Sequence, residues 1–200
     1  MIKIALLGAE STGKTQMVEA ITAQLRSQGH SVSPISETLR QWCDTAGRTP
    51  RADEQAAIAQ AHTERIAQAL DTTYLIADTT ALMTAVYSDL LFGDHSLYAA
   101  ALEQQRSFDL TLVMGLDLPC PAEDRATQEA FDAQLRLALQ VAGVTYRVIY
   151  GQGDTRVANA LNAIKLIAIN TYPTGGNEVF EVGNGMRTQR LRAWNCEKCS

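Results

Sequence analysis

The chain has 200 residues, of which 46% are hydrophobic, and a formal net charge of −5. This length allows one sizeable core and therefore predicts one main domain. The acidic balance argues against a general nucleic-acid-binding surface, which needs a basic patch, and no stretch approaches the ~20 apolar residues of a membrane-spanning helix. Four scattered cysteines do not form the disulfide framework of a small secreted domain, so we expect a cytoplasmic protein.

The first predicted element is a strand in the apolar run at residues 2–7, and residues 8–15 directly after it read GAESTGKT. This segment fits the Walker A pattern G-x-x-x-x-G-K-[ST] of a phosphate-binding loop (P-loop). A helix is predicted next, because Met17, Val18, Ile21 and Leu25 recur at helical spacing. The strand, loop and helix together predict binding of a nucleoside triphosphate, ATP in the leading interpretation.

Each residue type in this loop has a physical role in binding phosphate. Glycines let successive backbone N–H groups turn toward the phosphate oxygens at a helix N-terminus. Lys14 is expected to reach the β- and γ-phosphates, and the Thr15 hydroxyl is expected to bind Mg²⁺. The predicted ATP-binding residues of the loop are Gly8, Glu10, Ser11, Thr12, Gly13, Lys14 and Thr15.

The rest of the chain alternates between strand and helix patterns. Strands are predicted at 31–36, 74–77, 110–114 and 144–150, and helices at 39–46, 51–70, 81–91, 97–106, 127–141 and 157–169. This alternation predicts an α/β P-loop NTPase fold, a three-layer sandwich with a mainly parallel five-stranded sheet, over residues 1–169. Residues 170–200 are rich in turn signals and are predicted to be an extension with a small hairpin, whose Cys196 and Cys199 supply only two of the four ligands that zinc needs.

Pro34 places the strand at 31–36 at an edge of the sheet, and Glu37 and Arg40 follow that strand. In a helical turn these two residues share a face. In a small-molecule kinase, the carboxylate would orient or deprotonate the acceptor hydroxyl and the guanidinium would hold a phosphate or carboxylate. An ordinary exposed ion pair is the alternative interpretation.

Asp78 ends the third predicted strand and is the best-placed carboxylate for Mg²⁺ or for the acceptor, with Thr79 beside it as a substrate-binding residue. The alternative is that Asp78 caps the helix that begins near Ala81, with Thr79 and Thr80 assisting. Both roles are compatible with one carboxylate at this position.

Two later segments complete the predicted site. Arg125 lies in a polar connection after the fourth strand and is a candidate lid residue that closes over the phosphates, or else a solvated loop arginine. Gly151 and Arg156 follow the fifth strand, where a nucleotide base would lie, and Arg156 is a candidate for stacking on it. The alternative is a plain loop that leads to Asp154 as a helix N-cap.

In their order, these motifs resemble the NadR-like family of ATPase domains, which contains the ribosylnicotinamide kinases. The resemblance covers about residues 1–165 and is carried by the P-loop, Glu37 with Arg40, the ADTTALMTAVY stretch at 77–87, Phe108-Asp109 and residues 151–156. It implies ATP-dependent phosphorylation of the ribose 5′-hydroxyl of nicotinamide riboside, a step of NAD biosynthesis. The family pattern has Asp-Thr-Asp after the third strand, where this chain has Thr80 in the third position, and a longer lid than Asp124-Arg125.

The leading interpretation is therefore an Mg·ATP-dependent small-molecule kinase, with Lys14, Asp78, Glu37 and Arg125 as catalytic residues. Its expected partners are ATP and a small-molecule acceptor, with no nucleic acid and no membrane, while a protein partner or homo-oligomer is left open. The alternatives are a nucleotide-dependent switch or ATPase module acting on a protein partner and, third, a kinase for nucleotides, which needs more acceptor-side arginines than Arg40, Arg48 and Arg51 provide.

Overall fold

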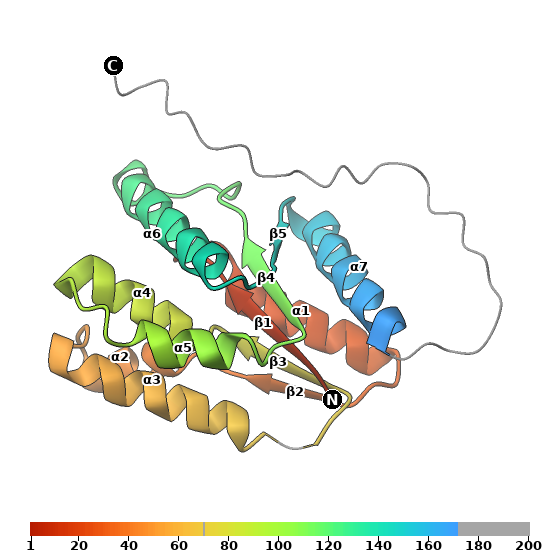
Figure 1. Ribbon diagram of the computed structural model, residues 1–200. Helices are drawn as coiled ribbons and strands as arrows, with labels where there is room; N and C mark the ends of the chain where they lie inside the picture. Colours follow the sequence, from red (N-terminus) through yellow and green to blue (C-terminus); the bar gives the residue numbers. More distant parts are fainter. Residues whose placement is uncertain (70, 172–200) are drawn as a thin grey trace.

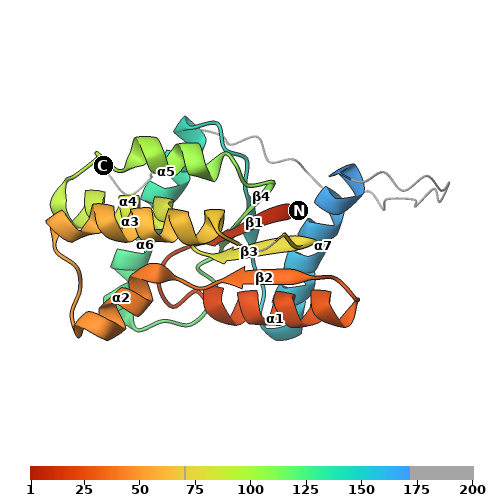
Figure 2. The ribbon, with the colours of Figure 1, turned by 90° about the horizontal axis from the view of Figure 1, so that it is seen from below.

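The computed structural model describes residues 1–69 and 71–171, which form a three-layer α/β sandwich (Figures 1 and 2). The predicted hairpin and Cys196 and Cys199 lie outside the described residues. The strands are β1 (Ile2–Leu7), β2 (Val32–Ile35), β3 (Tyr74–Asp78), β4 (Leu110–Met114) and β5 (Arg147–Ile149). The helices are α1 (Lys14–Ser27), α2 (Thr38–Ala46), α3 (Ala52–Ala67), α4 (Ala81–Phe92), α5 (Tyr98–Gln105), α6 (Ala122–Val141) and α7 (Gly153–Thr171).

The sheet is parallel throughout, in the order β2-β3-β1-β4-β5. This confirms the predicted P-loop NTPase fold and the edge position of β2, where Pro34 lacks an amide hydrogen for a ladder bond. β1 lies at the centre between β3 and β4, and Leu6 pairs with Asp78 in the register of β1 and β3. The loop after β1 and the carboxylate that ends β3 therefore meet at the carboxyl edge of the sheet, where ligands of open parallel sheets bind.

Side chains that alternate along β1 build a core on each face of the sheet. Ile2, Ile4 and Leu6 pack with the apolar faces of α1 and α7, whereas Ala5 and Leu7 face the core shared with α3, α4, α5 and α6. Figure 1 shows these two groups of helices on opposite sides of the sheet. Both cores hold the sheet rigid behind the P-loop, so the loop is attached to a fixed frame.

The structure corrects three predicted boundaries. α6 begins at Ala122 rather than at 127, because Pro121 needs no amide partner at the helix start and Glu123 and Asp124 favour the positive end of the helix dipole. β5 is limited to Arg147–Ile149, and α7 begins at Gly153, so Asp154 lies in its first turn and is not the N-cap. Across residues 1–69 and 71–171, the helices lack the combined length and apolar character that crossing a membrane requires.

Candidate functional site

The P-loop connects β1 to α1 in a conformation that depends on its glycines. Gly8 has a φ of 145° and Gly13 a φ of 77°. A Cβ atom on Gly8 would lie 3.1 Å from the Met114 Cβ and 3.2 Å from the Met114 amide nitrogen, so the β4 backbone leaves no room for a side chain. Ser11 adopts a φ of 59°, which is unusual for a residue with a side chain. The loop is therefore tightly folded against the end of β4.

Lys14 is buried at the start of α1, and its ammonium group turns back over the loop. Nζ donates hydrogen bonds to the carbonyl oxygens of Gly8, at 2.9 Å, and Ala9, at 2.8 Å. Burial lowers the pKa of Lys14, while the carboxylates of Glu37, Asp78 and Glu10 oppose that shift. The charges of these three carboxylates therefore favour the protonated form of the amine at the loop, and its contact with phosphate stays a prediction.

Asp78 lies directly beside Thr15, which donates its hydroxyl hydrogen to Asp78 Oδ2 at 2.6 Å. The other carboxylate oxygen, Oδ1, is buried and has no hydrogen-bond partner among the described residues. The capping alternative for Asp78 is wrong, because Thr80 is the N-cap of α4 and its Oγ1 accepts a hydrogen bond from the Leu82 amide. Asp78 therefore keeps a free carboxylate oxygen next to the Thr15 hydroxyl.

The two threonines after Asp78 turn away from the site. Thr79 is buried with a φ of 71°, and it does not line the cavity described below. Thr80 donates a hydrogen bond to Gln105 Oε1 at 2.7 Å, inside the core. The predicted substrate contact of Thr79 stays a prediction, and Thr80 belongs to the packing of α4 on α5.

A cavity of about 400 Å³ opens beside the P-loop. Its walls come from the loop, the start of α2, the segment before α3, α4 and the first half of α6. Polar residues that line it include Glu10, Lys14, Glu37, Arg40, Asp124 and Gln128, and apolar ones include Leu39, Pro50, Tyr87, Leu91 and Phe131. A volume of this size suits a small organic ligand.

Glu37 and Arg40 lie on the wall of this cavity and form the ion pair of the alternative interpretation, while their role toward an acceptor stays a prediction. Arg40 Nε is 3.3 Å from Glu37 Oε2, with side-chain exposures of 56% and 11% respectively. Arg40 NH1 also lies 3.5 Å from Thr15 Oγ1. Burial raises the pKa of Glu37, against the opposing effect of the Lys14 and Arg40 charges.

The side chain of Glu10 faces the cavity, which the loop motif did not reveal. Tyr87 on α4 donates its hydroxyl hydrogen to Glu10 Oε1 at 3.1 Å, and Gln128 on α6 donates to the Glu10 carbonyl at 2.7 Å. The Tyr87 ring packs on Phe131 with ring centroids 4.5 Å apart. From spacing alone, Phe131 is indistinguishable from a core residue, so its place at the cavity could not be predicted.

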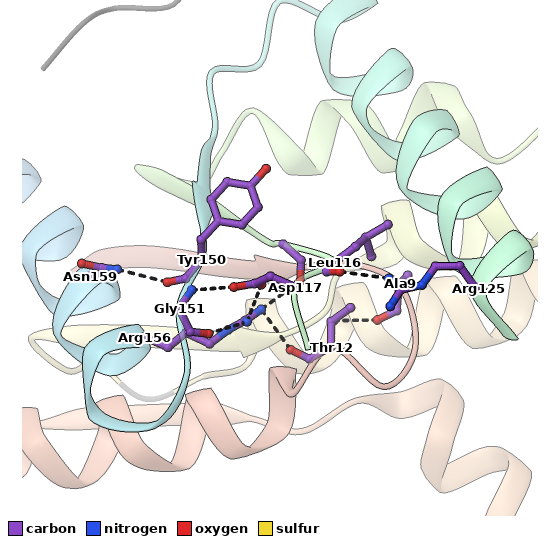
Figure 3. A network of polar contacts seen from close by, with 10 residues as sticks. Ala9, Thr12, Leu116, Asp117, Arg125, Tyr150, Gly151, Arg156 and Asn159 are labelled. Carbon is purple, nitrogen blue, oxygen red and sulfur yellow. Dashed lines mark hydrogen bonds and ion pairs between the residues drawn. The ribbon is translucent and has the colours of Figure 1, made fainter. Parts of the chain in front are cut away.

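Arg156 is buried behind the P-loop and joins the ends of β4 and β5 to it (Figure 3). NH1 lies 2.7 Å from Asp117 Oδ1 and donates to the Gly151 carbonyl at 3.0 Å. NH2 donates to the Gly115 carbonyl at 3.0 Å and, more weakly, to the Thr12 carbonyl at 3.4 Å. Because the side chain of Arg156 is only 5% exposed, a nucleotide base could stack on the guanidinium only if the surrounding groups moved.

Arg125 lies in the first turns of α6 and not in a polar connection. Its NH1 donates to the carbonyl of Leu116, after β4, at 2.9 Å (Figure 3). Its neighbour Asp124 lines the cavity. Arg125 is therefore near the site, with its guanidinium held by the backbone.

The loop, the adjoining carboxylate and the sheet order are those of a nucleotide-binding P-loop domain, and a family model described as an AAA domain matches residues 3–182. The chain belongs to this family. As an AAA domain it is a nucleotide-binding P-loop protein of the ATPase class. No curated protein matches the chain.

This AAA domain is also similar to a solved structure, described as the crystal structure of NadR protein in complex with NR. The TM-score is 0.69 at 18% sequence identity, over 83% of this chain and 50% of that chain. The AAA domain thus spans about half the length of that NadR protein. At this identity the similarity concerns the fold, and it confirms the NadR-like P-loop architecture expected from the motifs.

Proposed function

We propose that the protein is an Mg·ATP-dependent kinase that transfers the γ-phosphoryl group to a hydroxyl of a nucleoside such as nicotinamide riboside, in NAD biosynthesis. The observation that carries this proposal is the cavity of about 400 Å³ that is lined both by residues of the P-loop and by Glu37. A kinase needs a site for a second substrate next to the phosphate, with a carboxylate in it. A switch that only hydrolyses its nucleotide does not.

On the nucleotide side, the loop amides and Lys14 would bind the phosphate oxygens. Thr15 and Asp78 fit a magnesium ion, because a hydroxyl and a carboxylate are the oxygen ligands it prefers and Asp78 Oδ1 is buried without a partner among the described residues. Within the described ranges, no larger group of acidic, histidine or cysteine side chains forms a metal cluster. When bound there, the ion would neutralise charge on the phosphates.

Changing Asp78 to asparagine should raise the Mg²⁺ concentration needed for half-maximal nucleotide binding by about 10–100-fold. A loss of metal affinity of this size is typical when a group that organises a metal site is removed. The measurement is a Mg²⁺ titration of the binding of a fluorescent ATP analogue. Asp109→Asn is the matched control, because this carboxylate accepts a hydrogen bond from the Lys3 amide at the opposite edge of the sheet. Unchanged Mg²⁺ dependence in Asp78→Asn would contradict the assigned role.

On the acceptor side, Glu37 is the carboxylate that we assign to orienting the hydroxyl, since Asp78 is engaged with Thr15. Burial raises the pKa of Glu37, which makes it a better proton acceptor than an exposed glutamate. Arg40, close to Thr15, would bind the phosphoryl group as it transfers. Glu10 and the Tyr87–Phe131 pair would bind the ring of the acceptor, and Arg125 remains a proposed contact that would have to leave the Leu116 carbonyl.

The deciding experiment measures ADP release with Mg·ATP, with and without nicotinamide riboside, and follows the product by mass spectrometry. We expect riboside-dependent ADP release and a product that has gained one phosphate group. A nucleoside monophosphate offered in parallel tests the nucleotide-kinase alternative. ADP release that is slow and independent of any acceptor would overturn the kinase proposal in favour of a switch or ATPase module.

A further inference from the structure

His62 on α3 is a buried histidine whose two ring nitrogens both have hydrogen-bond partners. Nε2 lies 3.1 Å from the carbonyl oxygen of Thr79, and Nδ1 lies 2.7 Å from the hydroxyl oxygen of Thr38. A carbonyl oxygen can only accept, so Nε2 carries the ring proton and Nδ1 of the neutral ring accepts from Thr38. The partners thus fix both the tautomer and the orientation of the ring. His62 does not line the cavity.

The hydrogen bond from His62 to the Thr79 carbonyl, which we call the Asp78 arm, leads to the carboxylate proposed to bind Mg²⁺. Thr79 directly follows Asp78 and has a φ of 71°, a strained value for a β-branched residue that costs about 1–3 kcal/mol unless its surroundings hold it. Two hydrogen bonds of its own peptide groups do so: its amide donates to the Leu6 carbonyl at 3.0 Å, and its carbonyl accepts from His62. The Leu6 bond continues the sheet, whereas the His62 bond comes from a different layer.

The hydrogen bond between His62 and Thr38, which we call the α2 arm, leads to Glu37 and Arg40, the residues proposed to bind the acceptor. Thr38 is the first residue of α2, directly after Glu37 and two residues before Arg40. Its hydroxyl donates to His62 and accepts from Arg65 NH1 at 3.2 Å, while the same Arg65 nitrogen donates to Gln41 Oε1 at 2.6 Å. No residue of α2 is buried, so these polar contacts with α3 are a main constraint on the position of this helix.

We propose that His62 is a positioning residue that couples the two sides of the site. Through the Thr79 carbonyl it fixes the turn that directs Asp78 toward Thr15. Through the Thr38 hydroxyl it fixes the start of α2, which presents Glu37 and Arg40 to the cavity. The acceptor half of this inference rests on the proposed kinase function, whereas the Asp78 half requires only that the P-loop binds Mg·nucleotide.

The neutral ring sets the direction of the hydrogen bond between Thr38 and His62. A second ring proton on Nδ1 would face the Thr38 hydroxyl, which would then lose its acceptor and have to turn its own hydrogen elsewhere. Burial lowers the pKa of His62, which keeps the ring neutral near pH 7. The hydrogen-bond directions are therefore stable under the conditions in which the variants are compared.

The test compares a variant that cuts one arm, a variant that cuts both, and a variant that relaxes the turn at Thr79. Thr38→Val removes the hydroxyl with little change of shape and cuts only the α2 arm. His62→Leu cuts both arms. Thr79→Gly removes the strain at φ 71°, because glycine adopts such values freely. His30→Leu is the control, since His30 packs edge-on against Tyr74, and Tyr74 begins β3 at the other edge of the sheet from the site.

Two readouts separate the arms: the Mg²⁺ concentration for half-maximal binding of a fluorescent ATP analogue, and KM for nicotinamide riboside. Thr38→Val should raise the riboside KM about 10-fold, which is the loss expected for one hydrogen bond. Its Mg²⁺ requirement should stay within about twofold of the wild-type value. His62→Leu should raise both about 10-fold. Adding Thr79→Gly to His62→Leu should return the Mg²⁺ requirement most of the way to the wild-type value, whereas the riboside KM should stay raised.

General destabilisation would lower the melting temperature and the active fraction, and hence kcat, without this split. The inference fails if folded His62→Leu changes neither readout, or if Thr38→Val alters the Mg²⁺ requirement as much as the riboside KM. Should His62→Leu not fold, the split in Thr38→Val decides. If the wild-type protein does not phosphorylate the riboside, the kinase proposal fails by itself, and the Mg²⁺ requirement of His62→Leu and its Thr79→Gly combination still tests the Asp78 arm.

Discussion

Changing Lys14 to methionine is expected to reduce Mg·ATP-dependent turnover by about 10²–10³-fold, the largest functional effect that we predict. A fixed cation in a water-excluded site stabilises the charge that develops on the transferring phosphoryl group, and loss of one such group typically costs about 10²–10³-fold. Lys14 is also expected to bind the ground-state phosphates, so nucleotide affinity should fall with turnover. Steady-state ADP release and binding of a fluorescent ATP analogue measure the two effects.

The same change should leave the fold intact. Burial lowers the pKa of Lys14, which means that the folded protein disfavours its charge, so removing the charge should not reduce the free energy of unfolding appreciably. Lys165→Met is the matched control, because Lys165 is exposed on α7, far along the chain from the loop. Near-normal turnover in Lys14→Met, or an equal loss in both variants, would rule out the P-loop mechanism.

Most of the fold could be predicted from the sequence because its signals are local. The Walker A spacing fixes a strand, a loop and a helix in order, and the buried runs at 74–77 and 110–114 have the length and composition of central parallel strands. Pro34 correctly indicates an edge strand, because an amide missing from the ladder is tolerated only there. These features depend on the residues within each segment, so no long-range information is needed.

The site was less predictable wherever it depends on contacts between distant segments. The helix around Arg125 was missed because its first turn is polar and resembles a loop, although Glu123 and Asp124 favour a helix start. The inward direction of Glu10 depends on Tyr87, 77 residues away in sequence. Likewise, spacing cannot distinguish His62 from a core histidine, since its partners Thr38 and Thr79 come from two other elements.

Arg156 illustrates the same limit and provides the largest predicted effect on stability. Its position after β5 suggested contact with a nucleotide base, whereas its guanidinium is buried, with a side-chain exposure of 5%, against Asp117 and three carbonyl oxygens. Removing one partner of a buried ion pair typically costs about 3–5 kcal/mol. Asp117 is 30% exposed, so water can partly replace the lost contact and we expect the lower end, about 3 kcal/mol.

Arg156→Met should therefore lower the melting temperature by roughly 6–12 °C, at about 2–4 °C per kcal/mol for a chain of this size. Arg147→Met, at an exposed arginine of β5, is the matched control and should change stability by no more than about 0.5 kcal/mol.

Burial alone would raise the pKa of Asp117, but the Gly151 amide and the Arg156 charge outweigh it and hold that pKa below its ordinary value of 3.8. A carboxyl group with a depressed pKa stabilises the fold at pH values above its ordinary pKa, and this stabilisation is lost as the pH falls through the depressed pKa. The stability difference between wild type and Arg156→Met should therefore shrink in acid. A difference that stays constant down to pH 3, or a melting temperature equal to that of the Arg147→Met control, would show that the Arg156–Asp117 pair does not hold the P-loop to the ends of β4 and β5.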